Sequence, residues 1–399
     1  MEWSDGKIFR FKAISLMRRL KEEMRTHITE KRAERLLREL VSTPSPSGRE
    51  NEIGELIEER LTDAGLRIER MRVPGCRGFN LLCRIGEGGE TLILNGHMDT
   101  IPPYEMEHPY EPWIEDGVLH GRGACDMKGG LAAMILTAEE LSGVEAENTL
   151  LLTFVVDEEN QGLGTITLLL RGVRGDAAIV CEPTDLKLCT AQYGYVEVKL
   201  RTRGRSAHGA TPEWGVNAIE HMTRALEHLR RLPILWEGEE RPALNVGIIR
   251  GGEDSWIVPH LCEADILIST PPELPTSHVV EELRRHLSEL GDISPELEVL
   301  EMDEGYRLSL QEPIVRLMAE SIRRVLGCVE YSAARSWTDA NTLFNYGGIP
   351  TVVYGPGELH RAHSAVEGVR IRDVALCARV LTSACREFLM GGLSHNLLI

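Results

Sequence analysis

Acidic and imidazole side chains follow apolar stretches of this sequence. The stretch 91–94 leads to His97 and Asp99, and a second stretch leads to Glu158 and Glu159. Short apolar runs of this kind are typical of buried strands. A histidine and an aspartate two residues apart in an extended segment point to the same side. The carboxylate can then hold the imidazole, or both groups can approach one metal ion.

Two more such side chains follow the same arrangement, and a third lies at the start of a helical segment. Glu182 ends the apolar stretch 177–181, and His363 follows the stretch 350–354. Asp126 lies among glycines ahead of an apolar segment, and such glycines let the backbone approach a bound group closely. In open α/β sheets, ligands bind outside the carboxyl ends of the strands. We therefore expect these groups to gather at one edge of a sheet.

Two histidines and several carboxylates in one cleft suit a pair of zinc-like ions. Two ions about 3.5–4 Å apart form a recognised hydrolytic site, which polarises a carbonyl and lowers the pKa of a bound water. Asp126 has two carboxylate oxygens and can therefore bridge both ions. The sequence thus predicts a hydrolase that holds two divalent ions, Zn²⁺ or Co²⁺.

The overall composition argues against several classes of function. A chain of 399 residues is long enough for two domains, and its 42% hydrophobic and 27% charged residues are ordinary for a soluble protein. The formal net charge of −18 argues against nucleic acid and anionic membranes as partners. The nine cysteines are scattered without a CxxC pair, which indicates thiols in a reducing compartment and predicts a cytoplasmic protein.

The first 30 residues are basic, and their apolar pieces are too short for a signal peptide or a membrane span. They are either an extra amphipathic helix or sequence upstream of a start near Met17 or Met24. A helical pattern follows from about residue 27 to 40. Ser47 and Glu50 then predict a capping box at the start of a second helix.

Alternating strands and helices up to about residue 189 predict a three-layer α/β domain with a mostly parallel sheet. The segment 193–304 differs, since it reads as strands with two helices and contains no metal-type cluster. We expect a catalytic domain formed by residues 1–192 and 305–399, interrupted by a smaller α+β domain at 193–304. The family resemblance described below implies that this smaller domain is a lid that also forms a dimer contact.

Five segments resemble one family of enzymes in the family's own order. They are GHMDT, GRGACDMKGG, DEENQGLG, CEPTD and GPGELHRAHSAVE. They resemble the signature segments of the dinuclear zinc metallohydrolases, which include acetylornithine deacetylase, succinyl-diaminopimelate desuccinylase, aminoacylase and glutamate carboxypeptidase. The resemblance runs from about residue 45 to about residue 373. It implies five metal ligands, namely His97, Asp126, Glu159, Glu182 and His363.

The resemblance also implies roles for residues around the metals. Asp99 would bind the far nitrogen of His97, and Glu158 would be the general base. The peptide bond after Asp126 would be cis. His208, in the lid phrase GRSAHGATPEWGVNAI, would reach the active site of the other subunit of a homodimer and stabilise the oxyanion or hold the substrate carbonyl.

Two choices stay open at the level of single residues. His360 competes with His363 as a ligand, and His363 is preferred because His-Ser-x-x-Glu, ending at Glu367, matches the family. Trp256 and Leu267 stand where the family commonly has an asparagine and an arginine that bind a substrate carboxylate. That recognition is then absent or supplied elsewhere, for which Arg335 is a candidate.

The resulting hypothesis is a metal-dependent amidohydrolase that cleaves an N-acyl amino acid. The alternatives are a dipeptidase or carboxypeptidase acting on a short peptide, and a catalytically silent binding protein. The presence of Glu158 and of all five ligand candidates argues against the silent protein.

Overall fold

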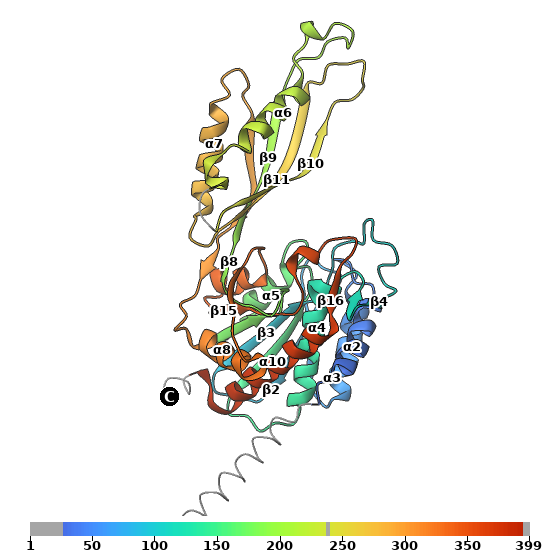
Figure 1. Cartoon of the computed structure of the whole chain (residues 1–399), viewed down its shortest axis with the longest axis vertical. Coiled ribbons are helices and arrows are strands. Elements are labelled where there is room, and N and C mark those ends of the chain that lie inside the picture. Colours follow the sequence, from blue (N-terminus) through green and yellow to red (C-terminus); the bar gives the residue numbers. More distant parts are fainter. Residues whose placement is uncertain (1–26, 237–239, 394–399) are drawn as a thin grey trace, which may run out of the picture.

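A computed structural model describes residues 27–236 and 240–393. The described chain has two separate hydrophobic cores, one in a large α/β body and one in a smaller unit at the other end of the molecule (Figure 1). The fold class predicted from the sequence is confirmed. The expectation for the first residues concerns a segment that lies almost entirely outside the described ranges. No helix in those ranges is long and apolar enough to cross a membrane.

The large body is built on a mixed sheet in the order β1-β2-β6-β3-β7-β15-β8-β13, with β14 pairing β8. Its centre is parallel, because β6, β3, β7 and β15 all pair in parallel. Every residue of β6 and β7 is buried, as expected for strands covered on both faces. The strands are β1 (Ile68–Arg72), β2 (Phe79–Ile85), β3 (Thr91–His97), β6 (Thr149–Val155), β7 (Ala177–Val180), β8 (Leu188–Gln192), β13 (Tyr306–Arg307), β14 (Tyr331–Ala334) and β15 (Thr351–Val353).

Helices cover both faces of this sheet. On one face, α4 packs on β3 and β6 and is itself flanked by α2, α3 and α10. On the other face, Asn95 of β3 points toward Thr165 of α5. The helices are α2 (Glu30–Ser42), α3 (Asn51–Asp63), α4 (Gly129–Leu141), α5 (Leu163–Leu170), α8 (Pro313–Leu326), α9 (Asp339–Asn341) and α10 (Ile371–Gly391).

A small three-stranded sheet lies beside the large one, in the order β16-β5-β4. Its strands are β4 (Trp113–Glu115), β5 (Val118–His120) and β16 (Gly368–Arg370). The pairing of Gly368 with His120 brings Glu367 next to the loop that leads to Asp126. This sheet therefore joins the segment before α10 to the loop after β5.

The smaller unit is a four-stranded antiparallel sheet in the order β10-β11-β9-β12, covered by two helices (Figure 1). Burial alternates strictly along β9, since one face of the sheet carries the helices. We call this unit the lid. Its elements are β9 (Gly194–Arg203), α6 (Ala218–Leu229), β10 (Ala243–Gly251), β11 (Leu261–Thr270), α7 (Thr276–Ser288) and β12 (Glu296–Asp303).

The capping box predicted for α3 is wrong. Glu50 occupies the N-cap position without a side-chain capping bond, and its carboxylate instead accepts from the backbone N–H of Gly48. The hydroxyl of Ser47 donates to the carboxylate of Asp99 at 2.7 Å. A hydrogen bond to a charged carboxylate is stronger than one between neutral groups, so the serine hydroxyl supports the site instead of capping the helix.

Candidate metal centre

The strand register brings the predicted side chains to one edge of the large sheet. His97 is the last residue of β3 and pairs with Val155, the last residue of β6, so Glu158 and Glu159 lie in the loop just beyond the end of that neighbouring strand. On the other side of β3, Glu182 comes two residues after the end of β7. The carboxyl ends of these parallel strands thus meet at one place, as the topology predicts.

The first group of possible metal donors is His97, Asp126 and Glu182. His97 Nε2 lies 3.1 Å from Asp126 Oδ1 and 3.4 Å from Glu182 Oε1. The second group is Asp126, Glu159 and His363. His363 Nε2 lies 3.1 Å from Glu159 Oε2 and 3.4 Å from Asp126 Oδ2. Asp126 is therefore common to both groups and directs one oxygen toward each.

Asp126 is presented by an irregular turn, Ala124–Lys128, that runs directly into α4. The peptide bond between Asp126 and Met127 is cis, as the resemblance implied. Gly130, in the first turn of α4, lies so close to the backbone of Cys181 that a Cβ would approach its carbonyl oxygen to 2.1 Å. A glycine is required there, and it lets α4 approach the segment that carries Glu182.

The charges of the two groups suit divalent cations. Burial, reinforced by Asp126, raises the pKa of Glu182 to about 8. Burial and Asp126 also raise the pKa of Glu159. Hydrogen bonds to Asp126 and Glu159 raise the pKa of His363 to about 10. Buried carboxylates that repel one another need positive charge nearby, and histidine and carboxylate donors are the ligands that zinc-like ions take. The residues present therefore fit two divalent ions.

Glu158 lies beside these donors but belongs to neither group. Its carboxylate is 3.9 Å from His97 Nε2, and it lines the same cavity as Glu159. Burial raises its pKa well above the usual value, although the charge of His97 opposes the shift. A carboxylate with a raised pKa and no ligand role has the properties of a general base.

Asp99 contacts both His97 and the loop after β6. The ring nitrogen His97 Nδ1 is 2.9 Å from the backbone carbonyl oxygen of Asp99, whereas the nearest carboxylate oxygen is 3.6 Å away. The two carboxylate oxygens accept instead from the backbone N–H groups of Glu158 and Glu159, each at 3.1 Å. The carboxylate of Asp99 thereby fixes the positions of both glutamates.

Glu367 is a buried carboxylate whose role the sequence analysis did not assign. It accepts from the backbone N–H groups of Gly123, Cys125 and Asp126, each at 3.0 Å. It also pairs with the buried guanidinium of Arg122 at 2.5 Å. Glu367 therefore holds the turn that presents Asp126. Its place in the same motif as His363 was the only signal in the sequence.

The two remaining predicted histidines lie in different places. His360 has a 75% exposed side chain and pairs loosely with Glu358, so the structure brings His363 and not His360 to Asp126. His208 lies exposed in the lid, with its ring against Trp256 at 6.3 Å. It is not among the residues that line the cavity over the metal groups of its own chain.

The lid contains a donor cluster that the sequence analysis did not expect. His228 and His286, near the ends of α6 and α7, stack at 3.8 Å with Glu289 beside them. Each ring Nε2 lies within 2.9 Å of the backbone carbonyl oxygen of the other histidine. Each ring thus satisfies a carbonyl at the end of the other helix, which gives the pair a structural role.

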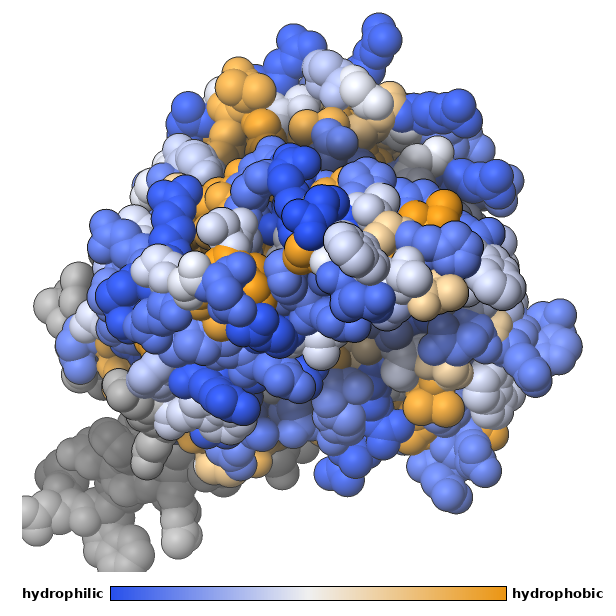
Figure 2. All heavy atoms as spheres, turned by 90° about the horizontal axis from the view of Figure 1, so that it is seen from above, coloured by the Kyte–Doolittle hydropathy of each residue, from blue (hydrophilic) through white to orange (hydrophobic). Residues whose placement is uncertain are grey.

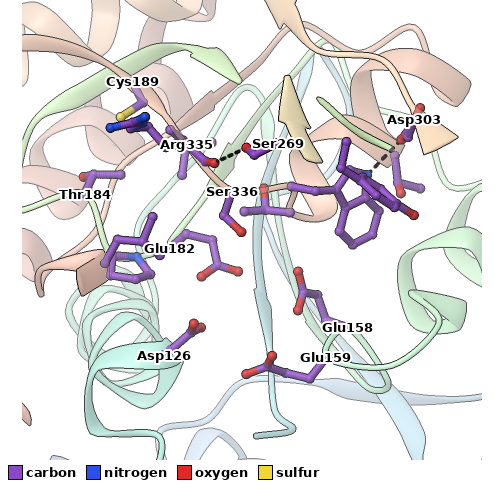
Figure 3. Close-up of a pocket in the computed structure, with 18 of the residues that line it drawn as sticks. Asp126, Glu158, Glu159, Glu182, Thr184, Cys189, Ser269, Asp303, Arg335 and Ser336 are labelled. Atoms are coloured by element: carbon purple, nitrogen blue, oxygen red, sulfur yellow. Dashed lines mark hydrogen bonds between the residues drawn. The ribbon is translucent and has the colours of Figure 1, made fainter. Parts of the chain in front are cut away.

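A cavity of about 1280 Å³ lies over the metal groups, between the large body and the lid. Asp126, Glu158, Glu159 and Glu182 form one end of it, and Ser269 and Asp303 of the lid border it on the other side (Figure 3). A cavity of this size accommodates a small substrate.

Comparisons with known proteins place this arrangement in a family. Residues 93–387 match the peptidase family M20/M25/M40. The chain belongs to this family. It is also 30% identical over 377 residues to an acetylornithine deacetylase of Edwardsiella ictaluri, covering 88% of this chain and 97% of that protein. The family is metal-dependent and hydrolyses amide bonds, so this chain is a hydrolase of that class.

Solved structures of the family share the fold. A tripeptidase of Staphylococcus aureus superposes with a TM-score of 0.75 at 24% identity, covering 90% of this chain and 98% of that one. Aminopeptidase PepT of Bacillus cereus gives 0.73 at 23% identity, covering 90% and 99%. The YXEP protein of Bacillus subtilis, described as a dinuclear metal-binding peptidase, gives 0.67 at 16% identity, covering 90% and 98%.

Replacing Glu367 tests whether the turn that presents Asp126 depends on it. In Glu367→Gln, an amide NH₂ would replace one carboxylate oxygen and face the N–H donors from which that oxygen now accepts. We expect metal affinity to fall by about 10–100-fold, the usual effect of removing a group that orients a ligand. Calorimetric zinc titration measures this. Glu358→Gln, which alters a partly exposed carboxylate nearby, is the matched control, and equal affinities in both variants would contradict the role of Glu367.

Proposed function

We propose that this family member is a dinuclear amidohydrolase that cleaves the amide bond of an N-acyl amino acid. The observation that carries the proposal is the pair of donor groups that share Asp126, with Glu158 beside them. His97 and Glu182 would complete one site, and Glu159 and His363 the other. When bound, the ions would supply a polarised carbonyl and a water of lowered pKa.

The protein's own groups would do the remaining work. Glu158 would accept the proton of the attacking water and deliver it to the leaving nitrogen, so that the amine departs neutral. Asp99 would hold Glu158 and Glu159 in different orientations through their backbone N–H groups. The burial of Glu158 raises its pKa, which makes its carboxylate a stronger proton acceptor than an exposed glutamate.

The deacylase activity is favoured by the sequence match to acetylornithine deacetylases, which spans most of both chains. A peptidase activity is the second candidate, because the structural neighbours include an aminopeptidase and a tripeptidase. Both reactions attack an amide carbonyl next to an amino acid and use the same site groups. Nine free cysteines, most of them buried, support a reducing, cytoplasmic location.

Substitution of the two adjacent glutamates should separate catalysis from metal binding. Glu158→Ala should lower kcat by about 10²–10⁴-fold, the usual effect of losing a general base, with metal content unchanged. Glu159→Ala should lower the metal content itself. Assays of acetate release from N-acetyl amino acids, together with elemental analysis, measure both. Loss of metal in Glu158→Ala with retention in Glu159→Ala would show that the roles are exchanged.

We further propose that the protein is a homodimer that pairs through the lid. The strand β10 is an edge strand of the lid sheet, and Ile248 and Ile249 on it are about half exposed. Trp256 is 68% exposed close to His208. Apolar side chains exposed along a free sheet edge favour pairing with another chain. Figure 2 shows apolar groups among hydrophilic ones at the lid end of the molecule.

The dimer would place His208 of one chain in the other chain's cavity. His208→Ala and Glu158→Ala homodimers should each be nearly inactive. A heterodimer of the two variants should regain up to about half the activity, because one of its two sites has both groups. Tagged co-purification isolates the heterodimer for assay. An active monomer in light scattering, or no recovery in the verified heterodimer, would contradict the proposal.

A further inference from the structure

The loop from Arg335 to Thr338 is tied to three strands where the lid joins the large body. The hydroxyl of Ser269, on β11, donates to the backbone carbonyl of Arg335 at 2.8 Å (Figure 3). The side chain of Gln192, at the end of β8, donates to the carbonyl of Ser336. The indole of Trp337 donates to Asp303, at the end of β12, at 2.8 Å. The backbone of this loop is therefore held in a fixed place on the cavity wall.

The cavity contains several basic side chains, and most of them already have acceptors. Arg174 donates to the backbone carbonyls of Leu169 and Val173. Lys187 lies 3.4 Å from the carboxylate of Asp185. His363 belongs to the second donor group, and His360 pairs with Glu358.

Arg335 differs from these groups because, in the part of the chain that the structure describes, its side chain hydrogen-bonds to the neutral hydroxyl of Tyr193 and not to a carboxylate or a backbone carbonyl. Its guanidinium lies over the ring of Tyr193, 5.7 Å from the ring centre. Within residues 27–236 and 240–393, no carboxylate forms an ion pair with it. A guanidinium offers five N–H donors in a planar fork that matches the two oxygens of a carboxylate. Arg335 is exposed and lines the same cavity as Glu158 and Asp126.

We propose that Arg335 binds the free carboxylate of the substrate and so selects N-acyl amino acids, or peptides, that end in a carboxylate. The inference rests on the proposed amidohydrolase function. It places the amide of the substrate at the metal groups and assigns to Arg335 the binding of the carboxylate at the other end of the substrate. The apolar side chain of Leu267, on β11, lines the same cavity and offers the carboxylate no donor. The lid strand β11 then contributes to the shape of the cavity, while Arg335 recognises the negative charge of the substrate carboxylate.

The test compares two substrates on the metal-loaded full chain. N-acetylornithine carries the carboxylate, and N-acetylornithinamide replaces it with a neutral amide. The wild-type protein should prefer the acid. Arg335→Ala should raise KM for the acid by about 10–100-fold, the range for losing a hydrogen-bonded charged partner, with kcat and the values for the amide little changed. Arg335→Lys should restore part of the preference, because it keeps the charge without the fork.

Arg174→Ala is the matched control, because it removes a cavity arginine whose donors are satisfied by the backbone. It should keep the preference for the acid. Equal losses for acid and amide in Arg335→Ala, or no preference in the wild type, would overturn the proposal.

Failure of the proposed function has a different signature. If the wild type releases acetate from neither compound, the proposed deacylase activity is refuted. The role of Arg335 is then tested by measuring the binding of ornithine and ornithinamide by calorimetry. Weaker binding of ornithine alone to Arg335→Ala would support the carboxylate site. Unchanged binding of ornithine by that variant would refute it.

Discussion

Asp126 directs one carboxylate oxygen at His97 and the other at His363. Around it lie the buried Glu182 and Glu159, whose side chain is 8% exposed, so that three carboxylates share a small volume with two imidazoles. Carboxylates so close together repel one another in a medium of low polarisability, and the arrangement is favourable only when cations compensate it. The rest of the site is built to hold Asp126 in this position.

Two other buried carboxylates do most of that holding. Glu367 accepts from three backbone N–H groups around Asp126, and Asp99 accepts from those of Glu158 and Glu159. Hydrogen bonds to a charged acceptor are stronger than neutral ones and have defined directions. The loop on each side of the site is therefore fixed by a carboxylate that is not itself a donor candidate for the metals.

The gathering of the metal donors was predictable from the sequence because strand ends are visible in it. Apolar stretches before His97, Glu158 and Glu182 predict parallel strands, and parallel strands end on one edge of a sheet.

The supporting contacts were not predictable in the same way. Glu367 is 241 residues from Asp126, and only the pairing of β16 with β5 brings them together. Ser47 has the local pattern of a helix cap but bonds to Asp99 instead, since a tertiary partner replaced the local one. The stacked His228 and His286 likewise meet only when α6 and α7 pack.

The central claim is that one aspartate serves two metal sites, and zinc titration of the metal-free protein by calorimetry tests it most directly. The account predicts two ions per chain for the wild type and loss of tight binding at both sites in Asp126→Ala, since each donor group loses a ligand. Asp185→Ala, which removes a carboxylate of the same cavity that pairs with Lys187, should still bind two ions. A wild-type stoichiometry of one ion, or an Asp126→Ala variant that keeps one site at full affinity, would contradict the shared role of Asp126.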